Sequence, residues 1–514
     1  MEPFRNEPLV DFTRPGAHER FEAEVEALRR RPPEHLPLVV GGRRVTTSES
    51  LVSLNPSHPS ETVATVARAG IAEAEAALDA AERALPAWSH LPATARAAVL
   101  LRAAGIMRRE RTRLSALECV EVGKPRGEAD ADVAEAIDFL EFYARAVIPL
   151  SGPQEVHSAP QELNELRHLP LGVGLILPPW NFPLAILTGM ASAAIVTGNT
   201  VLLKPSSVTP AIGWRYVEIM EAAGLPPGVL NFVPGSGSEI GAHLVQSPRV
   251  RFISFTGSRD VGLKINERAA RTPPGQRWIK RVVAEMGGKD AIVVLEDADL
   301  TAAAEAIVVS AFGFSGQKCS ACSRAIVVEA VYDRLVPELV RRTLNLVIGP
   351  AEARSTDVGP VSDAAAMEKI LGYIDLGKGE GRLLCGGRRL DGEGYLVEPT
   401  IFADVEPRAR IAQEEIFGPV LAVLRARDLD EALEIANDTV YGLTGAVFGR
   451  SRPALEHARE RFHVGNLYIN RKCTGALVGA HPFGGFNLSG TDAKAGGADY
   501  LRAFVQAQSI AERV

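Results

Sequence analysis

The sequence has few cysteines, few aromatic residues and no long run of one charge, and each shortage excludes a class of protein. Its 514 residues include five cysteines, an odd number at irregular spacing, so a complete disulfide framework is excluded. The first residues lack the apolar core of a signal peptide, which predicts a cytoplasmic protein in a reducing compartment. The absence of a Lys/Arg-rich run argues against a nucleic-acid partner.

The composition is that of an ordinary globular protein of two to four domains. Hydrophobic residues make up 46% and charged residues 23%, with a formal net charge of −7. One apolar stretch, residues 185–203, approaches the length of a membrane span. Small polar residues interrupt it, so we interpret it as a buried helix, a Gly-Asn turn and a buried strand, and we predict no membrane partner.

Strands and helices alternate along most of the chain. Apolar strand candidates at residues 172–177, 200–203, 229–233 and 251–255 are each followed by a helical pattern, and a second such block begins near residue 291. This alternation predicts an α/β fold with parallel sheets covered on both faces. We place a hairpin at residues 36–45, the domain boundary near Gly287–Gly288, and a strand from Tyr500 onward that pairs with another subunit.

Cys319 is the first candidate for chemistry, in Phe-Ser-Gly-Gln-Lys-Cys-Ser-Ala-Cys. A thiol is nucleophilic only as the thiolate, and Lys318 beside it is expected to lower its pKa. A cysteine in this position is also compatible with a structural role. The Cys319–Cys322 spacing is compatible with a redox pair that locks the nucleophile as a disulfide. Because no second metal-ligating pair accompanies it, we predict no metal site.

Two further residues are candidates for the same chemistry. Glu285 stands among apolar neighbours that would raise its pKa toward that of a general base, although an edge-strand glutamate facing water fits the pattern too. Asn181 lies in Pro-Trp-Asn-Phe-Pro, where two prolines fix an irregular backbone. Such a turn holds an amide rigidly as an oxyanion donor requires, or it is simply structural.

Two segments are candidates for binding a dinucleotide, and one fits the known pattern better than the other. The segment from Gly235 to Gly241 follows a strand, but its last spacing is one residue too long for the usual fingerprint. The segment Phe255-Thr-Gly-Ser258 is the better candidate, because Ser258 can cap a helix whose N-terminus attracts a pyrophosphate. Lys204, after a strand, is placed to reach ribose hydroxyls. Each segment is also compatible with an ordinary strand-to-helix turn.

Taken together and in order, these segments resemble the aldehyde dehydrogenase superfamily over nearly the whole chain, from about Leu36 onward. The matching segments are Pro179-Trp-Asn-Phe-Pro183, Lys204-Pro205, Phe255-Thr-Gly-Ser258, Glu285-Met-Gly-Gly-Lys289, Gly316-Gln-Lys-Cys319, Glu414-Glu-Ile-Phe-Gly-Pro419, Asn437-Asp-Thr-Val-Tyr-Gly-Leu443 and Pro482-Phe-Gly-Gly485.

The resemblance implies three structural parts. They are a Rossmann-like coenzyme domain (residues 1–150 and 171–286), an α/β catalytic domain carrying Cys319 (287–465), and a small β oligomerisation arm (151–170 and 488–514). It also implies a homo-oligomer, a dimer or larger.

The resemblance further implies roles for residues. Cys319 is expected to be the nucleophile, Glu285 the base that activates the deacylating water, and Asn181 with the Cys319 N–H the oxyanion hole. The positions expected to bind NAD are Trp180, Lys204, Ser207, Gly257, Ser258, Glu415 and Phe417. Many members that prefer NAD carry a glutamate where this chain has Ser207, so we predict that NADP is accepted beside NAD.

Within the superfamily, the chain most resembles the 1-pyrroline-5-carboxylate dehydrogenase family, which oxidises L-glutamate γ-semialdehyde to L-glutamate in proline catabolism. The resemblance rests on residues 318–324, on Asn470-Arg-Lys-Cys-Thr-Gly-Ala-Leu-Val-Gly479 and on the opening Glu2-Pro-Phe-Arg-Asn-Glu-Pro8. It implies a substrate carboxylate held by Ser323 and the N–H groups of Gly479 and Ala480, with Phe182 along the aliphatic part. Glu135 either faces the substrate ammonium or lies on a solvated helix face.

Three questions stay open at this level. The same chemistry on another semialdehyde, such as succinate semialdehyde, is the main alternative. A catalytically silent binding protein on this fold is disfavoured because Cys319, Glu285 and Asn181 are all retained. A proline dehydrogenase is a candidate partner that supplies the substrate.

Overall fold

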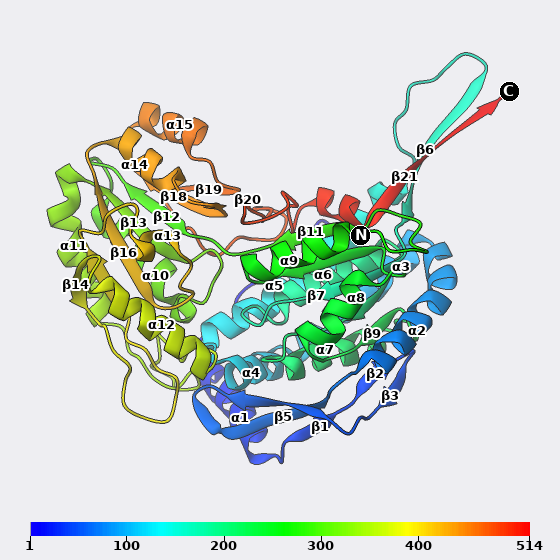
Figure 1. Cartoon of the computed structure of the whole chain (residues 1–514), viewed down its shortest axis with the longest axis horizontal. Helices are drawn as coiled ribbons and strands as arrows, with labels where there is room; N and C mark the ends of the chain where they lie inside the picture. Colours follow the sequence, from blue (N-terminus) through cyan, green and yellow to red (C-terminus); the bar gives the residue numbers. More distant parts are fainter. Residues whose placement is uncertain (1) are drawn as a thin grey trace.

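The computed structural model describes residues 2–514 and shows two α/β bodies side by side, with a two-stranded arm projecting from one of them (Figure 1). Each body is built on a seven-stranded sheet with its own hydrophobic core. No helix within residues 2–514 has both the length and the apolar character needed to cross a membrane. The fold is the predicted α/β arrangement, and the two sheets divide near the predicted Gly287–Gly288 boundary.

The first body is the Rossmann-like one. Its sheet has the order β11-β10-β7-β8-β9-β2-β3, in which β7 to β11 run parallel and β2–β3 forms the predicted hairpin. The strands are β2 (Leu38–Val40), β3 (Arg43–Val45), β7 (Val173–Leu177), β8 (Thr200–Leu203), β9 (Leu230–Phe232), β10 (Phe252–Thr256) and β11 (Arg281–Glu285).

Helices cover both faces of this sheet. They are α2 (Ile71–His90), α3 (Ala93–Arg109), α4 (Arg111–Val122), α5 (Arg126–Ser151), α6 (Ala185–Val196), α7 (Pro210–Ala222), α8 (Ala242–Gln246) and α9 (Arg259–Ala270). The apolar stretch 185–203 is therefore the buried helix α6, a turn and strand β8, as predicted from its interruptions.

The second body carries the sheet β14-β15-β16-β13-β12-β18-β19, parallel except for the edge strand β14. Its strands are β12 (Asp290–Val294), β13 (Cys322–Val328), β14 (Arg382–Cys385), β15 (Thr400–Ala403), β16 (Val420–Ala426), β18 (Thr444–Phe448) and β19 (Asn466–Ile469). Its helices are α10 (Leu300–Phe312), α11 (Glu329–Leu344), α12 (Ala364–Gly377), α13 (Arg410–Gln413), α14 (Leu429–Asn437) and α15 (Arg452–Arg461). Because β19 pairs with β18, this sheet extends past the predicted end at residue 465.

The arm is an antiparallel pair of β6 (Glu162–Pro170) and β21 (Val505–Arg513) within one chain (Figure 1). The expectation that the strand begins at Tyr500 is wrong, because residues 498–504 form a 3₁₀ helix whose Tyr500, Leu501 and Phe504 join the core of the first body. The predicted arm segment 488–514 thus begins too early, because the C-terminal strand of the arm starts only at Val505. These apolar side chains need a buried face, and a two-stranded ribbon offers none.

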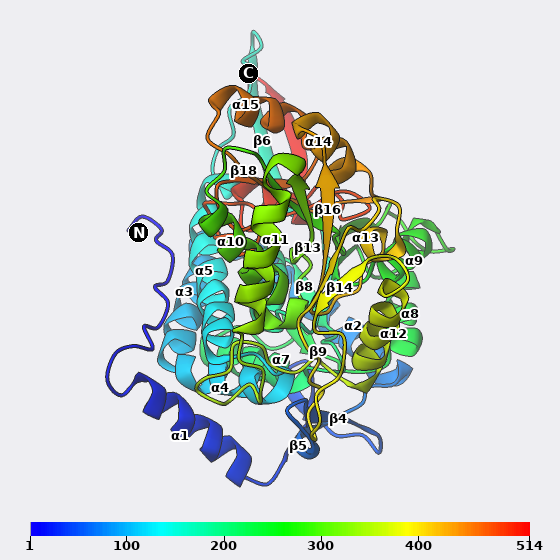
Figure 2. The same ribbon diagram turned by 90° about the vertical axis from the view of Figure 1, so that its left-hand side faces the viewer.

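The N-terminal residues form a strap along the first body (Figure 2). Asn6 Nδ2 and the Glu7 N–H both donate to the Asp138 carboxylate on α5, at 2.8 and 2.6 Å. Phe4 packs edge-on against Phe142 of the same helix. The strap leads to α1 (Ala17–Arg30) and a small sheet of β1 (Glu34–Leu36), β5 (His58–Ala67) and β4 (Ser50–Asn55).

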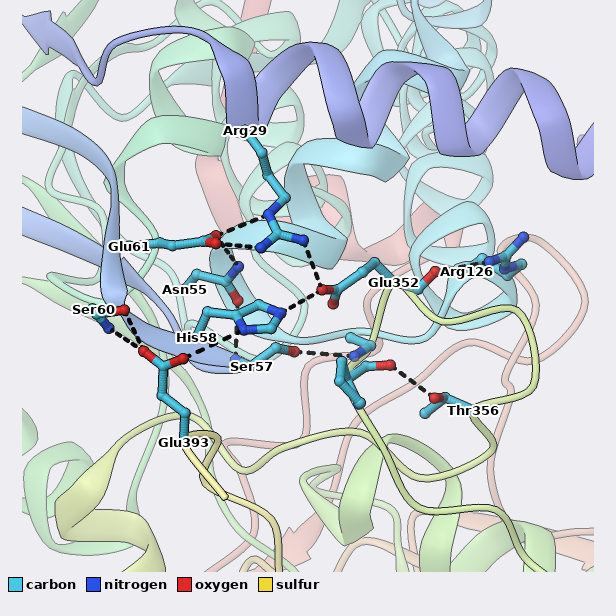
Figure 3. A network of polar contacts seen from close by, with 12 residues as sticks. Arg29, Asn55, Ser57, His58, Ser60, Glu61, Arg126, Glu352, Thr356 and Glu393 are labelled. Carbon is cyan, nitrogen blue, oxygen red and sulfur yellow. Dashed lines mark hydrogen bonds and ion pairs between the residues drawn. The ribbon is translucent and has the colours of Figure 1, made fainter.

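A polar network joins the two bodies (Figure 3), near α1 and β5 at the end opposite the arm (Figure 1). Glu352 of the second body accepts from His58 Nε2 at 2.6 Å and from Arg29 at 3.2 Å. Arg29 Nε also donates to the Glu61 carboxylate of β5. The Ala351 N–H donates to the Ser57 hydroxyl oxygen at 3.0 Å. These contacts fix the relative position of the two bodies and therefore the cleft between them.

Candidate active site

A cavity of about 1160 Å³ lies between the two bodies and receives side chains from both. The first body contributes the turns that follow the carboxyl ends of its parallel strands, which is where open α/β sheets bind ligands. The second body contributes the Cys319 turn and the segment around Glu415. The predicted residues on its lining are Trp180, Asn181, Lys204, Ser207, Gly257, Ser258, Cys319, Glu415 and Phe417.

Cys319 follows a tight turn at residues 313–316. Phe314 and Ser315 adopt left-handed backbone angles there, with φ of 51° and 57°, and the Ser315 hydroxyl donates to the Gly359 carbonyl at 2.7 Å. The side-chain oxygen of Gln317 accepts from the Ser362 N–H at 2.8 Å. These contacts hold the turn, so the half-buried thiol of Cys319 faces the cavity.

The thiol is not activated by its lysine neighbour. Burial is the largest influence and raises the pKa of Cys319, and the nearby carboxylates of Asp290 and Glu415 raise it further. Lys318 instead forms an ion pair with Glu128 at 2.7 Å. The prediction that Lys318 lowers the pKa of Cys319 is therefore wrong, and burial favours the protonated thiol.

Cys322 lies in the core of the second body. It is buried, its thiol donates to the Arg324 carbonyl at 3.4 Å, and it lies within hydrogen-bonding reach of Cys473. The interpretation of Cys319 and Cys322 as a redox pair stays a prediction, since both cysteines are free in this structure. The strand β13 begins at Cys322, and its alternation directs this side chain into the core.

Asn181 lies in the turn between β7 and α6, as its two flanking prolines predict. Its side chain is buried, and Nδ2 donates to the Gln317 carbonyl at 3.0 Å. An amide nitrogen carries two protons, so one remains for an oxygen bound in front of Cys319. The turn is thus both rigid and directed at the cavity.

Glu285 ends β11, the edge strand of its sheet, yet it is buried because residues 484–490 cover it. The interpretation of a water-facing edge residue is therefore wrong. The Gly485 N–H donates to Glu285 Oε2 at 3.1 Å, while Oε1 has no hydrogen-bond partner. Burial raises the pKa of this carboxyl well above its usual range, and its charge reaches Cys319.

The remaining cavity residues fit a dinucleotide. Burial lowers the pKa of Lys204 at the end of β8 to about 8. The Gly288 N–H donates to Glu415 Oε1 at 3.1 Å, and Trp180 meets Phe417 edge to face at 5.6 Å. Ser207 is exposed on the cavity wall. Ser258 occupies the residue before α9 as predicted, but its side chain makes no capping bond.

The glycine-rich segment at residues 235–241, whose spacing does not match the dinucleotide-binding fingerprint, also lines the cavity. Residues 237–241 form a π-helical turn, and the Gly241 N–H reaches back five residues to the Ser236 carbonyl at 3.1 Å. A π turn inserts one residue relative to an α turn. The extra residue accounts for a glycine spacing one residue longer than the usual fingerprint. The start of this helical segment still lines the cavity, where a ligand can bind.

Two of the predicted substrate residues, Glu135 and Phe182, belong to the first body. Glu135 on α5 is half-buried, and burial, with Asp132 second, raises its pKa to about 8, which excludes a solvated helix face. The ring of Phe182 lies under the ammonium of Lys124 at 4.1 Å. Lys124 is fully buried and pairs with Asp132, so it supports the wall beside Asn181.

The backbone part of the predicted carboxylate anchor is not formed by the residues named for it. The N–H of Gly479 donates to the Gly496 carbonyl at 2.8 Å and that of Ala480 to the Leu477 carbonyl at 3.1 Å, so neither is free to bind a carboxylate. Ser323 lines a different small cavity beside Gly418. The prediction is therefore wrong for the N–H groups of Gly479 and Ala480, because turn hydrogen bonds use these donors. The Ser323 hydroxyl has no hydrogen-bond partner, and its role as an anchor stays a prediction.

Two lysines near the site were missed in the sequence. Lys494 contacts the segment that covers Glu285, and Lys124 contacts Phe182. The run Pro482-Phe-Gly-Gly485 was a usable signal for the first, because two adjacent glycines mark a backbone that another group can approach closely. No pattern in the sequence indicated the second. Within residues 2–514 no cluster of His, Cys, Asp and Glu is arranged to hold a metal ion.

Comparisons with known proteins agree with this geometry. Residues 44–510 match the model of the aldehyde dehydrogenase family. A 1-pyrroline-5-carboxylate dehydrogenase of Geobacillus sp. (strain WCH70) is 55% identical over 512 residues, covering 100% of this chain and 99% of that one. A crystal structure of the Thermus 1-pyrroline-5-carboxylate dehydrogenase with bound NAD is 54% identical, with a TM-score of 0.99 and full coverage of both chains.

A larger relative is also similar. The proline utilization A protein of Bdellovibrio bacteriovorus is 44% identical with a TM-score of 0.98, covering 99% of this chain but 53% of that one. Sequence similarity over the whole length and a shared fold accompany the cavity that holds Cys319 and Asn181. The chain belongs to the aldehyde dehydrogenase family.

Proposed function

We propose that this chain oxidises L-glutamate γ-semialdehyde, in equilibrium with 1-pyrroline-5-carboxylate, to L-glutamate with NAD as the oxidant. The observation that carries the proposal is full-length similarity, at 54% identity, to an enzyme of that name solved with NAD. The cavity geometry supports the chemistry, because a thiol and an amide donor from different bodies face the same space.

The first half of the reaction uses Cys319 and Asn181. The thiol loses its proton and its sulfur attacks the aldehyde carbon, while the free Asn181 amide proton and the Cys319 N–H stabilise the resulting oxyanion. Bound NAD supplies the hydride acceptor, and the product on Cys319 is a thioester. Because burial disfavours the thiolate, a base must accept the proton as the sulfur attacks, and Asp290, Glu415 and Glu285 are the carboxylates whose charge reaches the thiol.

The second half uses Glu285. Its Oε1 is free of hydrogen bonds and accepts a proton from the water that attacks the thioester carbon. Its raised pKa makes the carboxylate a stronger base than an exposed glutamate. Hydrolysis breaks the carbon–sulfur bond, releases the acid and returns the thiol.

The substrate carries an α-ammonium group, and Glu135 is its proposed partner. The carboxyl of Glu135 is half-buried and has a pKa of about 8, so an approaching ammonium group would supply the partner that it lacks. This favours an amino-acid semialdehyde over succinate semialdehyde, which has no ammonium group. Phe182 lines the aliphatic part. Ser207 places no carboxylate at the cavity wall, so NADP is accepted beside NAD.

The arm is proposed to mediate assembly. The β6–β21 ribbon projects from the body with exposed Leu163 and Val514 at its end, and a two-stranded ribbon is unstable unless it packs on something. A homo-oligomer of a dimer or more would cover it. A proline dehydrogenase is the candidate partner that supplies the substrate, and the cytoplasm is the proposed location.

The test follows NADH absorbance with 1-pyrroline-5-carboxylate, succinate semialdehyde and a simple aliphatic aldehyde, using the native chain and Cys319→Ala. We expect the first substrate to have the highest kcat/KM and Cys319→Ala to keep less than a few per cent of turnover. Equal kcat/KM for the other aldehydes would overturn the substrate assignment while leaving the thioester chemistry intact.

A further inference from the structure

One peptide group links Lys494 to Glu285. The carbonyl oxygen of Gly484 and the N–H of Gly485 belong to the same peptide bond. The Lys494 ammonium donates to that oxygen, and the N–H on the other side donates to Glu285 Oε2 at 3.1 Å. The charged group and the carboxylate are therefore connected through two hydrogen bonds and one planar amide.

This arrangement strengthens the N–H donor. Peptide resonance moves electron density from nitrogen to oxygen, and an ammonium at the oxygen favours that charge distribution. The N–H becomes more positive and bonds a carboxylate more strongly, as in other chains of hydrogen bonds inside a protein. The effect is greatest in a buried setting, which is the setting of Glu285.

Lys494 donates its hydrogen bonds to backbone oxygens alone. It is half-buried, donates also to the Gly465 carbonyl at 2.7 Å and lies 5.1 Å from the centre of the Phe486 ring. Among residues 2–514 it forms no ion pair with a carboxylate. Asp492 and Glu285 are the acidic groups that its charge reaches.

Glycines make the close approach possible. A Cβ at Gly484 would lie 3.2 Å from Glu285 Oε1, and one at Gly490 would lie 2.9 Å from Oε2. A Cβ at Gly465 would lie 1.9 Å from the Gly484 oxygen and 2.8 Å from Lys494 Nζ. Glycine backbone thus lies against the Glu285 carboxylate and against the Lys494 ammonium. No side chain at Gly465, Gly484 or Gly490 competes for Glu285 Oε1.

We propose that Lys494 is a positioning residue for thioester hydrolysis: through the Gly484–Gly485 peptide it holds Glu285 Oε2 and leaves Oε1 directed at water. The proposal rests on the proposed function, since it assigns a task to the base of that reaction. It predicts that Lys494 acts on the second half of the reaction and not on thioester formation.

The charge of Lys494 also opposes the effect of burial on Glu285. The Gly485 N–H and the Lys494 charge both lower the pKa of Glu285, against the larger effect of burial. Removing the ammonium weakens both influences, so the pKa of Glu285 should rise. The base is active only when deprotonated, and the alkaline rise of the hydrolysis rate should therefore move to higher pH.

The experiment compares Lys494→Met, which keeps the chain length without charge, with Lys494→Arg, which keeps the charge. Rapid mixing with aldehyde and NAD resolves the first burst of NADH from the steady rate. We expect Lys494→Met to keep the burst rate within about threefold and lose at least tenfold in the steady rate at pH 7, with its pH midpoint higher by half a unit or more. Lys494→Arg should recover much of the loss.

A second measurement does not depend on turnover. Infrared difference spectra between each protein and its Glu285→Gln counterpart report the protonation of the Glu285 carboxyl, and its midpoint should be higher in Lys494→Met. The matched control is Lys378→Met, which removes an exposed charge paired with Asp375. An unchanged midpoint, or equal losses of burst and steady rates, would overturn the proposal. Absence of NADH production by the native protein would count against the proposed function alone.

Discussion

The side-chain amide of Asn181 donates to the main-chain carbonyl of Gln317 at 3.0 Å, and this bond joins the two bodies at the reacting thiol. Asn181 belongs to the first body and Gln317 to the turn that carries Cys319. The proposed oxyanion donor and the proposed nucleophile are thereby held in fixed relation, as electrostatic stabilisation of a transition state requires.

Replacing Asn181 with Ala should lower kcat/KM by about 10²–10³, the loss typical of one missing oxyanion donor. NADH formation with saturating NAD is the measurement. Asn181→Ser is the matched control for the size change, since a hydroxyl can restore part of the donor. A loss below tenfold, in a protein with native NAD affinity, would show that Asn181 does not stabilise the oxyanion.

Replacing Glu285 with Gln should slow hydrolysis and make folding less dependent on pH. Because burial raises the folded pKa of Glu285, the native fold binds its proton more tightly than the unfolded chain does. Stability is then full below the unfolded pKa of roughly 4.5 and falls as pH rises through the folded pKa. The Gln variant lacks this fall, so its melting temperature should exceed the native one increasingly from pH 5 to pH 9. A constant difference across that range would contradict the raised pKa.

Replacing Ser207 with Glu should reduce the use of NADP and leave that of NAD nearly unchanged, because a carboxylate at this wall repels a 2′-phosphate. We expect the native NADP/NAD efficiency ratio to exceed about one in a thousand, or 4 kcal/mol of discrimination, and the variant ratio to fall at least tenfold. Ser207→Gln is the uncharged control. Equal ratios for the Glu and Gln variants would mean that charge at this position does not select the cofactor.

Replacing Glu135 with Gln should raise the KM for 1-pyrroline-5-carboxylate several-fold and leave that for succinate semialdehyde unchanged. The carboxyl group, with its pKa of about 8, is expected to bind the ammonium of the open-chain glutamate semialdehyde, which forms only from the first substrate. The comparison of two substrates separates recognition from a general loss of structure. Parallel changes for both aldehydes would remove Glu135 from the substrate site.

Replacing Glu352 with Ala should destabilise the contact between the two bodies. Glu352 is the shared acceptor of Arg29 and His58, and its side chain is 17% exposed (Figure 3). Arg29 is partly solvated, so we expect a loss of about 1 kcal/mol, seen as a lower denaturation midpoint. Arg14→Ala, which removes an exposed ion pair with Asp11, is the control and should change nothing. Equal midpoints for both variants would contradict a stabilising network.

Local sequence patterns predicted a helix or strand correctly where nearby residues alone mark its ends. Residues 185–203 divide into α6 and β8 because small polar residues mark the turn between them. The spacing rule failed at residues 235–241 because a π turn adds a residue, which a fixed motif does not allow. The C-terminal strand began later than predicted, since Tyr500, Leu501 and Phe504 find a buried face in the first body.

The sequence by itself determined the family resemblance, the α/β alternation and the residue types for thioester chemistry at Cys319, Glu285 and Asn181. Only the tertiary structure decided which donors are free, since the N–H groups of Gly479 and Ala480 are used by contacts that no local pattern specifies. It likewise decided that Lys318 pairs with Glu128 and that Lys494 reaches Glu285 through a peptide. Charge and hydrogen bonding depend on distance and burial, and these arise only when segments hundreds of residues apart come together.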